Sequence, residues 1–280
     1  LCYNCSAAIT LRKRIHQLAG ADCKGITICT FHSLAIRLLG ISAIDLFTDG
    51  NHNKAEMNRK FDDIIKDATT LLNGEIEIPG MDQDEVLQSL IGSWSHILID
   101  EYQDIDEIQY DFVSAIAGRL RNNEDSKLSI LAVGDDDQNI YAFRNASTKF
   151  ICKFEDDYNA ERHHLVENYR STSNIINSSN QLIALNGDRM KTDFPIKINK
   201  TRKSNPSGGD WGEVDSLSKG LVQILPINGS DHQASVVLEE IKRIRNLSGD
   251  DFNWSDIAIF GRTHKELNPV RALLEKNKIP

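Results

Sequence analysis

The stretch ILIDEYQD, residues 97–104, joins an apolar, β-branched run to a cluster of carboxylates and is the strongest local signal in the chain. The run predicts a buried strand that delivers Asp100 and Glu101 together at its end. In phosphoryl transfer the first acid of such a pair can hold Mg²⁺, usually through water, and the second can orient and deprotonate the attacking water. A bare Asp-Glu pair is more often a solvated acidic turn, so the surrounding sequence must decide between the two interpretations.

The same alternation, an apolar run that stops at polar residues before a helical pattern, occurs five times along the chain. The predicted strands are ITIC (26–29), HILI (96–99), KLSILAV (127–133), HHLV (163–166) and DIAIF (256–260). Continuous apolar runs are typical of parallel strands covered on both faces, and alternation with helices indicates βαβ units. We therefore predict an α/β fold with a doubly wound parallel sheet, in which ligands bind at the carboxyl ends of the strands. Residues 42–90, with apolar residues at helical spacing, are predicted to be a helical insertion.

Two further strand ends carry polar residues suited to a nucleotide and to unpaired bases. The strand over 127–133 is followed by three consecutive aspartates and Gln138, and an amide there can sense a terminal phosphate without adding charge. Tyr141, Phe143 and Arg144 follow, a mixture suited to base stacking and backbone contact, although two such aromatics alone are more often core residues. After the strand over 163–166, Arg170 can reach a phosphate or pair with a surface acid, and Tyr169 offers a ring.

The composition excludes several classes of protein. The 280 residues carry 32 Lys and Arg against 41 Asp and Glu, a formal net charge of −9, which argues against coating nucleic acid through bulk charge but leaves room for a local cationic groove. No apolar stretch approaches the roughly 20 residues of a membrane-spanning helix, and no signal segment opens the chain. Five irregularly spaced cysteines fit a reducing cytoplasm better than a disulfide framework or a zinc site. The chain begins with Leu1 inside an apolar segment, so we expect it to be a piece of a longer protein.

These signals, in this order, resemble the UvrD/Rep/PcrA-type superfamily 1 DNA helicases over nearly the whole chain. YNCSAAITLRKRI (3–15) is similar to motif Ia, TFHSL (30–34) to motif Ib and IDEYQD (99–104) to motif II. VGDDDQNIYAFRNA (133–146) is similar to motif III and LVENYRS (165–171) to motif IV. DIAIFGRT (256–263) and LLEKNKIP (273–280) resemble the stretch before the family's large second insertion.

The resemblance implies a RecA-like fold and an ATP-driven motor on single-stranded DNA. Residues 1–41 and 91–160 would belong to the first RecA-like lobe, 42–90 to its insertion and 161–280 to part of the second lobe. The implied cofactors are ATP and Mg²⁺, with Asp100 holding Mg²⁺ and Glu101 activating water. Gln138 would contact the γ-phosphate, Arg170 would serve as an arginine finger and Tyr169 would stack on adenine. The residues implied to line the single-strand path are Tyr3, Thr30, Phe31, His32, Tyr141, Phe143 and Arg144.

Departures from the family pattern leave two other interpretations open. No GxxxxGK[ST] phosphate loop occurs in these residues, Cys5 and Ser6 stand where the family commonly has Asn and Lys, and Asn145 replaces a usual Gly. The chain is thus expected to hydrolyse ATP negligibly by itself. A catalytically dead, helicase-like module that binds DNA or protein would also lack the loop, but it has no need of the acids, Gln138 and Arg170. The motor subunit of a helicase–nuclease would share every motif.

Overall fold

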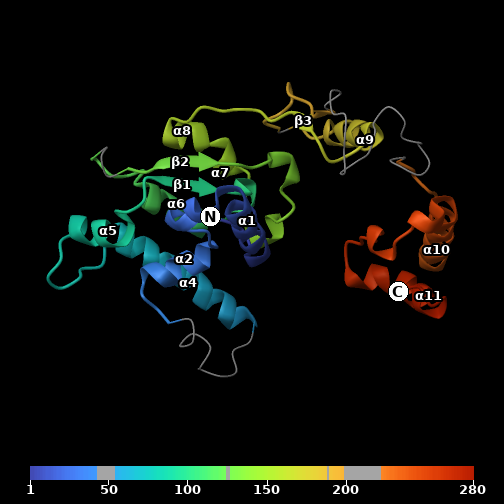
Figure 1. The fold of residues 1–280 in the computed structure, drawn as a ribbon, viewed down its shortest axis with the longest axis horizontal. Coiled ribbons are helices and arrows are strands. Elements are labelled where there is room, and N and C mark those ends of the chain that lie inside the picture. Colours follow the sequence, from blue (N-terminus) through green and yellow to red (C-terminus); the bar gives the residue numbers. More distant parts are fainter. Residues whose placement is uncertain (43–53, 124–126, 188, 199–221) are drawn as a thin grey trace. The chain divides into compact units, whose positions relative to one another are not determined.

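A computed structural model describes residues 1–42, 54–123, 127–187, 189–198 and 222–280, apart from the side chains of 54–59, Arg144 and Asp251 (Figure 1). The chain forms two compact units, Leu1–His163 and His164–Pro280. None of the helices in these ranges is both long and apolar enough to span a membrane.

The first unit contains helices on a small parallel sheet. In chain order its elements are α1 (Cys5–Ala19), η1 (Gly20–Gly25), α2 (Phe31–Leu38), α4 (Lys54–Leu72), α5 (Gln83–Ile91), β1 (His96–Ile99), η2 (Tyr102–Asp104), α6 (Glu107–Ala117), β2 (Ser129–Ala132), η4 (Asp136–Gln138), η5 (Ala142–Arg144), α7 (Lys149–Cys152) and α8 (Phe154–Tyr158). The second unit contains β3 (Glu167–Asn168), α9 (Ser173–Ile183), β4 (Lys197–Ile198), α10 (Gly229–Ser248), η6 (Gly249–Asp251), η7 (Trp254–Asp256) and α11 (His264–Lys276).

The sheet of the first unit is built around β1 and β2, which run parallel with Ile97 opposite Ile130 and Ile99 opposite Ala132. The chain start extends it on the other side of β1, because the Asp100 amide donates to the carbonyl of Leu1 (3.0 Å). Cys2 in turn pairs in parallel with Thr30, and its amide donates to the carbonyl of Cys29. Four segments of chain therefore lie side by side in one direction at this sheet.

The core of the first unit lies where α2, α4 and α6 pack with β1. Each helix buries residues spaced three and four apart, as an amphipathic helix must, and the fully buried ones include Phe31, Ala35, Ile65, Ala68, Leu72, Phe112, Val113 and Ile116. Burying each of the large side chains stabilises the fold by roughly 1.5–3 kcal/mol. The helix predicted within residues 42–90 is thus present as α4, and it shares this core. Residues 43–53 of the predicted insertion lie outside the described part of the chain.

Helix boundaries follow local capping chemistry. The Thr30 hydroxyl accepts from the Ser33 amide at the start of α2, and the Asp106 carboxylate accepts from the Gln109 amide at the start of α6. Asp82 and Glu85 form a reciprocal capping box at the start of α5. These short polar side chains satisfy amides that the helix itself leaves unpaired.

The sheet expected from the sequence is realised only in part. The strand over 96–99 is β1 and that over 127–133 contains β2, but the strand expected at 163–166 is replaced by β3, which begins at Glu167. The run expected as a strand at 26–29 forms no named strand, and a single bridge pairs the next residue, Thr30, with Cys2. The strand expected over 256–260 is not among the strands of the described ranges, where β1–β2 and β3–β4 form two separate two-stranded sheets. A strand requires a neighbour for its backbone hydrogen bonds, and an apolar run does not supply one. Nor are both faces covered, since Leu98 is 58% and Leu131 55% exposed.

Candidate active site

The polar residues that follow the parallel segments of the first unit meet at one edge of its sheet. Tyr3 follows Cys2, Thr30 follows Cys29, and Asp100 follows the last residue of β1. The turn after β2 is tied to the turn after β1, because the Tyr102 amide donates to the carbonyl of Val133 (3.0 Å). Segments far apart in sequence are thereby held within hydrogen-bonding distance of one another at their carboxyl ends.

Glu101 occupies an unusual backbone conformation at this edge. Its φ of 55° and ψ of 47° lie in the left-handed region, which L-residues other than Asn, Asp and Gly rarely adopt. Such a conformation costs on the order of 1 kcal/mol or more and persists only where the surroundings impose it. Here the Glu101 amide donates to Asp100 Oδ1 (3.1 Å), and the carbonyl of Glu101 accepts from the Asp104 amide (3.0 Å). The turn holds both carboxylates at the strand end, with the Glu101 side chain exposed.

The buried side chain of Gln103 connects this turn to the one after β2. Gln103 Nε2 donates to Glu101 Oε2 (2.7 Å), and Gln103 Oε1 accepts from the Asp135 amide (3.0 Å). Gly134 makes this approach possible, because a Cβ at that position would lie 2.7 Å from Gln103 Oε1. Gln103 is not among the site residues predicted from the sequence; the signal that could have found it was a polar residue two positions after Glu101, in the turn that follows an apolar run.

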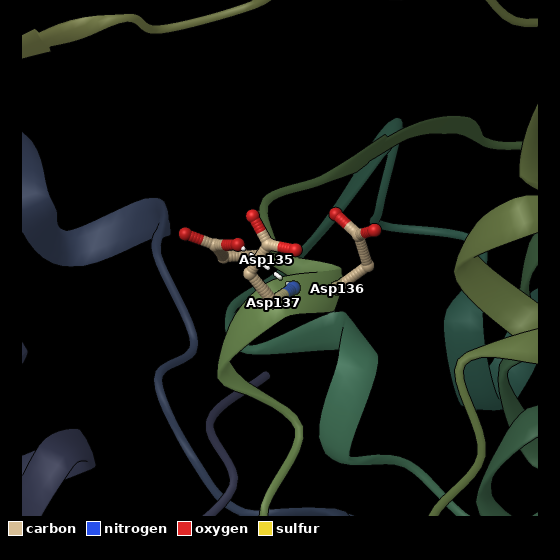
Figure 2. A group of neighbouring side chains, drawn as sticks. All are labelled: Asp135, Asp136 and Asp137. Carbon is tan, nitrogen blue, oxygen red and sulfur yellow. Dashed lines mark hydrogen bonds between the residues drawn. The ribbon is translucent and has the colours of Figure 1, made fainter. Parts of the chain in front are cut away.

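The three aspartates project from the turn that contains η4 (Figure 2). One carboxylate oxygen from each residue lies within 4.8 Å of one from each of the others. Asp135 also has a structural role: Oδ1 accepts from the Asp137 amide (3.1 Å), and Oδ2 accepts from Gln138 Nε2 (2.8 Å). These bonds offset part of the repulsion between the carboxylates. They also connect Gln138 through Asp135 and Gln103 to Glu101.

Asp104 is a buried acid in the turn after β1, and its Oδ1 accepts no hydrogen bond from the described residues. Burial, together with the negative charge of Glu101, raises the pKa of Asp104 to about 6. A carboxyl group with that pKa changes charge close to neutral pH, which the sequence alone did not indicate.

Three aromatic residues form a cluster beside this edge. The rings of Tyr3 and Tyr141 stack with centroids 5.3 Å apart, and the ring of Phe143 lies 5.9 Å from that of Tyr141. Phe143 is 77% exposed. The next residue, Arg144, has a side chain outside the described part of the structure. Asn145 adopts φ 64° and ψ 10°, so it keeps the left-handed turn that a glycine would favour.

The TFHSL segment has a more structural character than expected. Thr30 is buried and caps α2, while Phe31 is 1% exposed and packs in the core, so its ring does not face solvent as a base contact requires. His32 is half-buried, with its ring edge against Phe61 (5.3 Å between centroids). Burial lowers the pKa of His32, partly opposed by Asp62 and Asp106. The aromatic that follows an N-cap is therefore an apolar anchor of α2.

Tyr169 and Arg170 belong to the second unit and are exposed at the end of β3. Asn168 organises the turn that carries them, since its Oδ1 accepts from the amides of Arg170 (2.9 Å) and Ser171 (2.7 Å). The Tyr169 hydroxyl donates to the Glu167 carboxylate. Helix α9 (Ser173–Ile183) begins directly after this turn, with Thr172 at its N-cap position.

The carboxylates and the amide at the edge of the first unit are suited to one side of a site that binds Mg²⁺ and a triphosphate. Carboxylate oxygens suit Mg²⁺, and Asp100 and Glu101 present them together at the end of β1. Gln138 adds an exposed amide on the neighbouring turn. The GxxxxGK[ST] motif that cradles phosphates through backbone amides does not occur in the 280 residues. The 280 residues therefore contain groups suited to holding the metal and the attacking water of such a site, but not the motif that cradles the phosphates.

Comparison with known proteins gives two family matches that together cover most of the chain. Residues 42–159 match the UvrD/REP helicase N-terminal domain, and residues 163–280 match the UvrD-like helicase C-terminal domain. The ATP-dependent DNA helicase UvrD1 of Mycobacterium tuberculosis is 33% identical over 221 residues, and the ATP-dependent DNA helicase PcrA of Staphylococcus epidermidis is 31% identical over the same length. DNA helicase II of Haemophilus influenzae is 45% identical over 105 residues.

Each match covers a much larger share of this chain than of the related protein. The UvrD1 and PcrA matches cover 79% of this chain but 25% of those proteins, and the helicase II match covers 38% of this chain and 14% of that protein. The chain therefore spans about a quarter of the length of the curated relatives with the longest matches.

Proposed function

Because the chain belongs to the UvrD/REP helicase family, we propose that it forms part of an ATP-dependent DNA helicase that moves along single-stranded DNA. Its cofactors are ATP and Mg²⁺. Residues 1–41 and 91–160 contribute to a first RecA-like lobe with 42–90 as its insertion, and 161–280 contribute to a second. The proposal is supported most directly by the hydrogen-bonded path from Glu101 through Gln103 and Asp135 to Gln138, because it joins the acids after one strand to the amide after the next.

The proposed chemistry is hydrolysis of the terminal phosphate. Asp100 is the residue that holds Mg²⁺, which when bound neutralises charge on the phosphate oxygens. Glu101 takes a proton from the attacking water at its carboxylate. Gln138 contacts the γ-phosphate: one N–H of its side-chain amide donates to Asp135 Oδ2, and the second N–H is the donor that we assign to phosphate. Arg170 supplies positive charge as an arginine finger, and Tyr169 stacks on adenine.

The proposed path for single-stranded DNA passes the aromatic cluster of Tyr3, Tyr141 and Phe143. Phe143 is exposed, whereas Tyr3 and Tyr141 are half-buried and stack on each other. Aromatic rings at a surface provide stacking platforms for successive bases without sequence preference. Tyr141 follows Gln138 by three residues, so a shift of the turn on nucleotide binding is carried directly to the stacking surface. Thr30, His32 and Arg144 complete the proposed path, with Phe31 assigned to support α2 from the core.

The decisive substitution is Glu101→Gln in the full-length protein. Loss of the proton acceptor is expected to reduce DNA-stimulated ATP hydrolysis by about 10²–10⁴-fold while ATP still binds. Glu107→Gln is the matched control, because Glu107 is an exposed glutamate at the start of α6, and it should leave turnover nearly unchanged. Turnover retained by Glu101→Gln would remove Glu101 from the proposed role and, with it, the catalytic assignment of this edge.

A further inference from the structure

Both ends of the Gln103 side-chain amide are used, and they bind two different turns. The donor end binds the Glu101 carboxylate at 2.7 Å, and the acceptor end binds the Asp135 amide at 3.0 Å. The main chain takes part too, since the carbonyl of Gln103 accepts from Asn139 Nδ2 (2.5 Å). Gln103 is 1% exposed, so none of these bonds is readily replaced by water.

An amide in this position does more than fill space. A buried amide is unfavourable unless its donor and acceptor are both satisfied, and an apolar side chain of similar size would avoid that requirement. The amide instead selects one oxygen of Glu101, Oε2, and so sets the direction of an otherwise exposed carboxylate. It does so from the same rigid group that binds the start of the turn carrying Gln138.

We propose that Gln103 is a positioning residue that orients the Glu101 carboxylate and fixes its place relative to the turn that carries Gln138. This inference rests on the proposed function, because it assigns Gln103 through the role of Glu101. The bond to Oε2 leaves Oε1 as the oxygen that receives the proton from water. Gly134 is part of the same arrangement. Only a residue without a Cβ leaves room for Gln103 Oε1, since a Cβ at position 134 would lie 2.7 Å from that oxygen.

The first test is Gln103→Met in the full-length protein, a change of similar volume that removes both side-chain bonds. A carboxylate that is free to rotate should lower the kcat of DNA-stimulated ATP hydrolysis on the order of 10–100-fold. The KM for ATP should change by less than about threefold, because Gln103 is not among the residues proposed to contact the nucleotide. Gln109→Met is the matched control: Gln109 is also a buried glutamine, lies on α6, and its Oε1 has no partner among the described residues. It should keep kcat within about threefold of the unaltered protein.

A second test separates positioning from a general loss of stability. Gly134→Ala introduces a Cβ 2.7 Å from Gln103 Oε1 and 2.8 Å from Ile151 Cδ1, so it should displace the amide and reproduce the kcat defect. Both changes act through the same bonds. The kcat of the double variant Gln103→Met, Gly134→Ala should therefore lie within about threefold of the kcat of the slower single variant. If Gln103→Met fails to fold, Gly134→Ala measured alone decides the question.

The outcomes distinguish this inference from the function on which it rests. An unaltered kcat in Gln103→Met or in a folded Gly134→Ala, with Glu101→Gln inactive, would overturn the role of Gln103 and leave the proposed function standing. Multiplicative defects in the double variant would also overturn it, because they indicate independent effects. An active Glu101→Gln would instead refute the catalytic assignment itself.

Discussion

Asp104 lies in the same turn as Glu101, in surroundings that disfavour its charged form. Burial and the neighbouring Glu101 charge raise its pKa from an ordinary value of 3.8 to about 6. The folded chain therefore binds a proton at Asp104 more tightly than the unfolded chain does. The resulting loss of stability is present above about pH 6. It disappears as the pH falls towards 3.8, the pKa of this group in the unfolded chain.

Replacing Asp104 by Asn is accordingly expected to stabilise the protein at pH 8, where it removes a disfavoured buried charge. The thermal midpoint should rise by roughly 2–4 °C at pH 8, and this gain should vanish near pH 4. Differential scanning calorimetry at the two pH values measures it. Asp67→Asn, on the exposed side of α4, is the control and should shift the midpoint little at either pH. A gain of equal size at both pH values would contradict this account of Asp104.

Glu101 and Asn145 show how left-handed residues serve the two turns in different ways. Asn tolerates a positive φ, so Asn145 forms its turn with little strain. Glu101 does not share that tolerance, and hydrogen bonds from its neighbours maintain its conformation. The strain therefore lies at the residue to which we assign the chemistry, as is common at catalytic positions.

At the scale of elements, the turns containing η4 and η5 connect the proposed phosphate contact to the aromatic cluster. Asp135 holds Gln138 at one end, and the Tyr3–Tyr141 stack holds the other end against the start of the chain. A short segment restrained at both ends transmits a displacement instead of absorbing it. This arrangement is the physical route that we propose between the proposed nucleotide and DNA sites.

Tyr141→Ala tests that route on the DNA side. Loss of a stacking ring should weaken the binding of single-stranded DNA to the full-length protein by roughly 5- to 150-fold, equivalent to about 1–3 kcal/mol per base. Tyr141→Phe keeps the ring and should bind within about threefold of the unaltered protein. Fluorescence anisotropy with a labelled oligonucleotide gives both affinities. Equal affinities for the Ala and Phe variants would exclude Tyr141 from the DNA path.

At the scale of the whole molecule, the chain carries a net charge of −9 and two separate compact units. A net acidic surface does not attract the DNA backbone in bulk, so the proposed binding of DNA depends on local contacts such as the aromatic cluster. Of the residues with proposed roles, Glu101 belongs to the first unit and Arg170 to the second.

The 280-residue chain by itself is expected to hydrolyse ATP at least about 10²-fold more slowly than the full-length protein, because its sequence lacks the loop that cradles the phosphates. A phosphate-release assay with single-stranded DNA present, run on both proteins at equal concentration, measures the ratio. Glu101→Gln in the full-length protein defines the background. Turnover by the chain alone well above that background would show that the missing loop is dispensable.

The sequence predicted β1, the position of β2 and helix α4 because each depends on a local pattern of apolar residues. It also predicted which polar residues follow the strands, since those are neighbours along the chain. It was wrong about the strands at 163–166 and 256–260, because pairing partners are not encoded within the run itself. The family match agrees with the resemblance read from the motifs.

The sequence alone therefore determined the family and the carboxylates that end the first strand, since consecutive residues carry both signals. Only the tertiary structure decided that Gln103 bridges Glu101 and Asp135, that Phe31 belongs to the core and that Asp104 is buried. The bond between Gln103 and Asp135 joins residues 32 positions apart in sequence, brought together when parallel segments pair at one sheet edge. A hydrogen bond or a buried charge is a property of that proximity, and no local pattern specifies it.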